Sequence, residues 1–121
     1  MSERSAISAL VGLRLAVGLA SWLTPRPAGK LFGLDVPANP QAPYLARLFG
    51  ARDVALAVGA FSSEGDARRQ WLQAGLACDV ADALAGLAGG RGGYLPKPTS
   101  ALVTGTALSA VALGAFALRE Q

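Results

Sequence analysis

The sequence predicts an all-α protein, a four-transmembrane-helix bundle with up-down-up-down topology, and three observations lead to this fold class. First, 52% of the 121 residues are hydrophobic and only 16% are charged, whereas about a quarter of a soluble domain is charged. Second, the chain contains 25 Ala and 15 Gly, the small residues that let helices approach closely in lipid. Third, the apolar residues form four blocks, each near the roughly 20 residues that cross a bilayer.

The four blocks make residues 1–121 a single membrane domain. The predicted helices cover about residues 5–23, 42–62, 70–89 and 99–118. The last block is the clearest, because no charge occurs between Pro98 and Leu118, where a soluble amphipathic helix would show a polar stripe. The first block carries Arg14 at its centre, which is atypical of a cleaved signal peptide, so we expect a mature helix there. A soluble bundle rich in small residues is the alternative.

The three connections between the blocks differ in composition. Five of the seven prolines lie in or next to the first one, residues 24–41, which predicts an ordered, non-helical cover. The second, residues 63–69, is short and polar. The third, residues 90–98, is rich in Gly and then in Pro. It lacks the spacing of a phosphate-binding loop and is interpreted as a helix end and a turn.

Four spans would place both termini on the same side of a cell membrane. Each side then carries four basic loop residues, so the positive-inside rule does not choose an orientation, and a cytoplasmic N-terminus is the default. Small residues recur every four positions at Ala101, Gly105 and Ser109, a packing face within the monomer or in a homodimer. The bilayer is the expected partner, and no nucleic acid is, because the +3 charge is diffuse and lacks interleaved aromatic residues.

Six charged residues lie inside the predicted helices, three of each sign. They are Arg14, Arg47, Arg52, Asp53, Asp79 and Asp82. A charge at the bilayer centre costs at least about 2.5–3.5 kcal/mol, so we expect ion pairs. Counting from the block ends pairs Arg47 with Asp82, and Arg14 or Arg52 with Asp79 or Asp53, in a cluster that opens towards the Pro-rich connection.

The cluster has two main interpretations. As a polar site, it would bind or transform a hydrophobic small molecule, the usual implication of intramembrane ionisable residues. As a set of ion pairs, it would only fix helix packing in a structural or accessory membrane subunit. A dimeric transporter of an ion or small solute is a third alternative.

If the site is catalytic, Asp79 and Asp82 are the acid and base candidates, and the arginines would stabilise an anion. Isomerisation, cyclisation or epoxide opening of a lipid-like substrate would suit such groups. The chain has no His and a single Cys, which excludes zinc sites, disulfides and His-based catalysis. No metal and no cofactor are expected. Cys78 has no base beside it and is interpreted as a packing residue.

The segment Arg47-Leu-Phe-Gly-Ala-Arg-Asp53, followed by Asp79-Val-Ala-Asp82, resembles a family of small bacterial four-helix integral membrane proteins that is classed as a domain of unknown function (DUF). The architecture is also loosely similar to that of DoxX-like membrane proteins. The resemblance implies a four-helix membrane fold over nearly the whole chain. It implies no activity, so no catalytic role follows from it.

Overall fold

The computed structural model describes residues 2–119, and within that range it contains five helices and no strand. The helices are α1 (Glu3–Leu23), α2 (Pro25–Leu31), α3 (Ala42–Ser62), α4 (Gly65–Gly92) and α5 (Lys97–Arg119). The predicted all-α class is therefore confirmed. The four long helices correspond to the four apolar blocks, and α2 is an addition.

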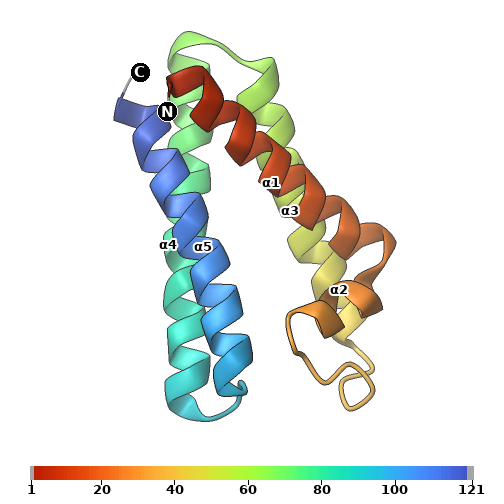
Figure 1. The fold of residues 1–121 in the computed structure, drawn as a ribbon. Coiled ribbons are helices and arrows are strands. Elements are labelled where there is room, and N and C mark those ends of the chain that lie inside the picture. The colour runs from red at the N-terminus through yellow and green to blue at the C-terminus, as the bar shows by residue number, and fades with distance from the viewer. Residues whose placement is uncertain (1, 120–121) are drawn as a thin grey trace.

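The four long helices form two pairs, α1 with α3 and α4 with α5 (Figure 1). They run in alternating directions, so α1 begins and α5 ends at the same end of the molecule (Figure 1). The pairs meet through less extensive contacts of α1 with α5 and of α3 with α4. At the opposite end, the Thr99 hydroxyl of α5 donates a hydrogen bond of 2.9 Å to the carbonyl of Gly33, which ties the first connection to the second pair.

Small residues allow the helices within a pair to touch. A Cβ added to Gly18 of α1 would lie 2.9 Å from the carbonyl oxygen of Gly50 in α3, so the two backbones are in direct contact at this crossing. The core is correspondingly built from alanines and a few leucines. This close approach is the packing that the Ala and Gly content predicts.

The first connection is partly helical, so the prediction of a wholly non-helical cover is wrong for Pro25–Leu31. Pro25 stands in the first helical turn, where the missing proline N–H would have had no intrahelical acceptor. Proline density predicts a loop, but the N-terminus of a helix accepts proline equally well. Beyond Leu31 the connection contains turns, including Gly33 with a φ of 82°.

Helix α4 is longer than the predicted 70–89, and the connection before it contains only two residues, Ser63 and Glu64. The charged stretch after Glu64 was assigned to a loop. However, Asp66 lies in the first turn of α4 and Arg91 in its last turn. At these positions each charge interacts favourably with the helix dipole and stabilises the helix. Gly93, in the left-handed region with a φ of 80°, then ends the helix.

Among the described residues, two helices are long and apolar enough to cross a membrane, α1 and α5. The other two long helices, α3 and α4, have sufficient length, but they carry five of the six internal charges. By length and composition alone, two of the four predicted membrane spans are therefore supported, those in α1 and α5.

Candidate functional site

The first part of the site is a buried ion pair between Arg14 of α1 and Asp79 of α4. The Arg14 Nη1 donates to Asp79 Oδ1 at 3.0 Å, and Nη2 donates to Oδ2 at 2.6 Å. Each side chain is only 5% exposed. The planar guanidinium matches both carboxylate oxygens at once, the geometry of a strong charge-assisted pair. One of the pairings expected from the sequence is thus confirmed.

Gly75 makes room for this pair. It lies one turn before Asp79 on the same face of α4, and a Cβ added there would be 2.6 Å from Arg14 Nη2. Any larger residue would therefore displace the guanidinium. Sequence reasoning missed this role. The available signal was a glycine four positions before a buried aspartate.

The second part of the site is more open and joins Arg52 of α3 to Asp82 of α4. Nη1 donates to Asp82 Oδ1 at 3.1 Å and Nη2 to Oδ2 at 2.6 Å. Nη2 also reaches Oδ1 of the neighbouring Asp53, at 3.5 Å. The side chains of Arg52 and Asp82 are 34% and 31% exposed. This pair is therefore accessible, unlike the first.

Arg52 has two further features. Its guanidinium carbon lies 4.7 Å from the centre of the Phe49 ring, a cation–π contact. Phe49 was not predicted as part of the site, although its position three residues before Arg52 puts both on one helix face. In addition, the Nε of Arg52 is buried and has no hydrogen-bond partner, which is unfavourable for a buried donor.

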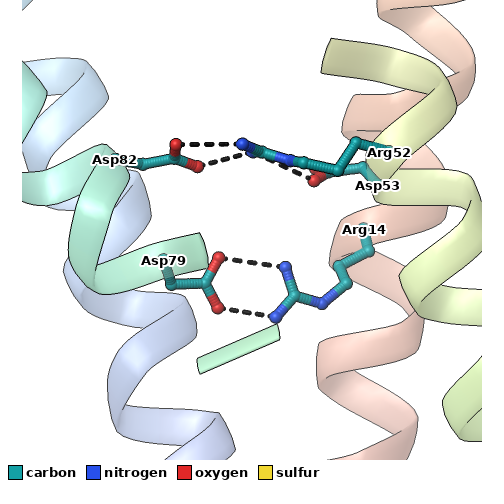
Figure 2. A network of polar contacts seen from close by, with 5 residues as sticks. All are labelled: Arg14, Arg52, Asp53, Asp79 and Asp82. Atoms are coloured by element: carbon teal, nitrogen blue, oxygen red, sulfur yellow. Dashed lines mark hydrogen bonds and ion pairs between the residues drawn. The ribbon is translucent and has the colours of Figure 1, made fainter. Parts of the chain in front are cut away.

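Figure 2 shows the two ion pairs one above the other, each bridging from the α1–α3 pair to the α4–α5 pair. Asp79 and Asp82 share one face of α4, as their spacing predicts. Two guanidinium groups face three carboxylates in this cluster, which leaves it formally one negative charge in excess. Asp53 makes the longest contact, so it is the least neutralised carboxylate.

The expected pairing of Arg47 with Asp82 is wrong. The Nε of Arg47 donates instead to the backbone carbonyl of Trp22, at 3.0 Å, and Asp82 is bound by Arg52. Trp22 is next to the last residue of α1, where carbonyl groups have no intrahelical partner. Arg47 therefore caps the end of α1 and stands apart from the ionic cluster.

Other features of the described residues lie outside the cluster. Among these residues there is no group of three or more His, Cys, Asp or Glu side chains that could hold a metal ion. Two open hollows, of about 470 Å³ between α4 and α5 and about 170 Å³ between α1 and α3, are lined by none of the six internal charged residues. Cys78, beside Asp79, is a half-buried free thiol.

The chain matches no family model, no curated protein and no solved structure. The resemblance of its Arg47–Asp53 segment to small bacterial membrane proteins stays a prediction.

Proposed function

We propose that the protein is an integral membrane protein whose four long helices all cross the bilayer of the cell membrane. The supporting observation is the distribution of charge on α3 and α4. Asp53 and Asp79 are about 5% exposed, whereas Leu45, Phe61 and Leu84 on the same two helices are more than 60% exposed. Charges inside and large apolar side chains outside are the reverse of a soluble surface. In lipid this arrangement satisfies both groups.

Fractionation of expressing cells tests the membrane location. The chain is expected to stay in the membrane pellet after extraction with alkaline carbonate, which releases peripheral proteins, and to enter solution only with detergent. Recovery in the soluble fraction without detergent would contradict the proposal.

We further infer that the open part of the cluster, formed by Arg52, Asp53 and Asp82, binds the polar end of a hydrophobic small molecule. The observation that carries this is the buried, unpartnered Nε of Arg52, close to a carboxylate of Asp53 that is held only by a 3.5 Å contact. The cluster thus contains one donor and one acceptor that are incompletely satisfied, and both are buried beside the partly exposed Arg52–Asp82 pair. An apolar molecule with a hydroxyl or amide head group could accept a hydrogen bond from the Nε of Arg52 and donate one to the carboxylate of Asp53.

The closed part of the cluster has a different role in this proposal. Asp79 uses both carboxylate oxygens on Arg14, which favours a structural role over proton transfer. Asp82 is more exposed, but it too is held by two hydrogen bonds. The acid and base assignments of Asp79 and Asp82 stay predictions, and binding is the function that the geometry supports best.

Mass spectrometry of molecules that co-purify in mild detergent tests the binding site. An apolar compound with a polar head is expected with the native protein and at a much lower level with Asp53→Ala. Asp66→Ala is the matched control, because Asp66 is an exposed acid in the first turn of α4 and lies outside the cluster. Equal amounts of the compound with both variants, or none with the native protein, would contradict the proposal.

A structural or accessory subunit is the second candidate. It is favoured because each guanidinium group binds both oxygens of one carboxylate, and because the hollows between α4 and α5 and between α1 and α3 lie away from the cluster. Exchanging the charges of Arg52 and Asp82 separates the two candidates, as described in the Discussion.

A further inference from the structure

A groove outside the ionic cluster runs between α4 and α5 and has a volume of about 470 Å³, within the usual range of small-molecule sites. Its walls have two distinct parts. Arg91 of α4 and Lys97 of α5 line one end, and small or apolar residues line the rest. The apolar part includes Leu87, Ala101, Gly105 and Leu108.

The basic end lies where the α4–α5 connection would meet a membrane surface. Arg91 is in the last turn of α4, and Lys97 is the first residue of α5. Both side chains are exposed, and neither has an ion pair or hydrogen bond within residues 2–119. Two unpaired cations at the mouth of an apolar groove favour a ligand with an anionic head.

The length of the groove fits one leaflet of a bilayer. Lys97 and Leu108 are separated by eleven residues of α5, which corresponds to about 16 Å along a helix. The hydrocarbon layer is about 30 Å thick, so half of it is about 15 Å. A head group at Lys97 would therefore place an acyl chain along the groove as far as the middle of the bilayer.

The groove also faces away from the ionic cluster. Leu87 follows Asp82 by five residues, which is a rotation of about 140° around α4 at about 100° per residue. Asp82 is directed towards Arg52 of α3, so Leu87 lies on the side of α4 turned from α3. Its side chain is 49% exposed. The groove therefore opens towards the surroundings of the bundle, where lipid would be its neighbour.

We propose that this groove binds one anionic phospholipid of the surrounding bilayer. The phosphate contacts Arg91 and Lys97, and an acyl chain lies against Leu87, Gly105 and Leu108. Thr104 also lies on the wall of the groove, with its buried hydroxyl packed against Gly86 of α4. The inference rests on the proposed membrane location and is independent of the Arg52 site.

Native mass spectrometry of the detergent-solubilised full chain tests the proposal. The protein is titrated with phosphatidylglycerol and, separately, with phosphatidylcholine, which has the same chains but no net charge. Preferential binding of phosphatidylglycerol is expected, and the Arg91→Gln/Lys97→Gln variant is expected to weaken it about tenfold or more, because hydrogen bonds to charged groups are lost. Arg26→Gln/Lys30→Gln is the matched control, since both are exposed cations on α2 outside the groove.

The apolar part of the groove is tested by a second pair of variants. A Cβ added to Gly105 meets nothing within 4 Å, so a larger side chain can start from this position, and Gly105→Leu is expected to occupy part of the groove and lower phosphatidylglycerol binding. Gly12→Leu is its control, because Gly12 of α1 is equally open and lies outside the groove.

Three outcomes would overturn the inference. One is equal binding of the two lipids, and another is equal weakening by the groove variants and their controls. The third is displacement of the lipid by inorganic phosphate alone, which would indicate a site for free anions. If the chain stays with the membrane pellet, these outcomes remove only the lipid site. If the chain is soluble without detergent, the membrane location and the lipid site fail together.

Discussion

The two ion pairs that join the halves of the bundle have nearly the same hydrogen-bond geometry but very different surroundings. Arg14–Asp79 is sealed, with each side chain 5% exposed, whereas Arg52–Asp82 is about one-third exposed. The sealed pair satisfies both of its charges, while Arg52 retains a buried donor without a partner. The same two residue types are thus fully satisfied in one place and incompletely satisfied in the other, which is the basis of the binding role proposed for Arg52.

The largest effect is expected from breaking the sealed pair. Arg14→Met leaves Asp79 charged and buried without a partner, and the loss of one member of a buried pair destabilises by about 3–5 kcal/mol. The free energy of unfolding in mild detergent measures this loss. In the double variant Arg14→Met/Asp79→Leu, much of the stability is expected to return, because no orphaned charge remains. A single variant as stable as the native protein would refute the structural role of this pair.

A smaller effect is expected from crowding the sealed pair without removing a charge. In Gly75→Ala the added methyl group would lie 2.6 Å from Arg14 Nη2, and overpacking of this kind costs about 1–3 kcal/mol relative to the same substitution at an open helix position. The control is Gly12→Ala, where a Cβ meets nothing within 4 Å. Because Ala favours helix over Gly by about 1 kcal/mol, the control is expected to be neutral or stabilising. Similar unfolding free energies for the two variants would contradict the close approach.

Breaking the open pair is expected to cost less. Arg52→Met should destabilise by about 1 kcal/mol, between the values for exposed and buried pairs, since the pair is about one-third exposed. The charge exchange Arg52→Asp/Asp82→Arg then separates the two candidate functions. In a purely structural pair the exchange restores stability, and no bound molecule changes. In a binding site it restores stability but abolishes co-purification of the ligand.

The smallest effect is expected at Arg47. Arg47→Gln removes one exposed hydrogen bond to the Trp22 carbonyl, which is worth about 0.5 kcal/mol. The free energy of unfolding of Arg47→Gln is measured under the same conditions as that of Arg52→Met, so that the two losses can be compared. If Arg47→Gln were as destabilising as Arg52→Met, Arg47 would be paired with a carboxylate, and the division of the arginines drawn here would be wrong.

The sequence was sufficient to predict the four long helices, because the apolar blocks are long. It also predicted five of the six charges that meet between them, with Arg47 as the exception. The shared face of Asp79 and Asp82 followed from their spacing. Which arginine pairs with which aspartate did not follow from the sequence. Counting along a block locates a charge only to within about one helical turn, and an arginine side chain is itself long enough to reach a neighbouring turn. Counting therefore selected Arg47 as the partner of Asp82, where the structure has Arg52.

The limits of the helices depended on features that composition does not resolve. The polar residues after Glu64 look like a loop, but they begin α4, since a helix end tolerates charges of the favourable sign. Proline predicted a loop where it begins α2. The role of Gly75 was hidden because a glycine that provides space is identical in sequence to one that provides flexibility, and only the position of Arg14 distinguishes them.

The sealed pair also has a consequence for the order of events during synthesis. Arg14 and Asp79 are 65 residues apart in the chain. Because a ribosome adds about 5–20 residues per second, the partner of Arg14 is made about 3–13 s after Arg14 itself. During that interval α1 exists with an unmatched cation. The pairing of Arg14 with Asp79 can therefore form only after this part of α4 has been made, while α5 is still to follow.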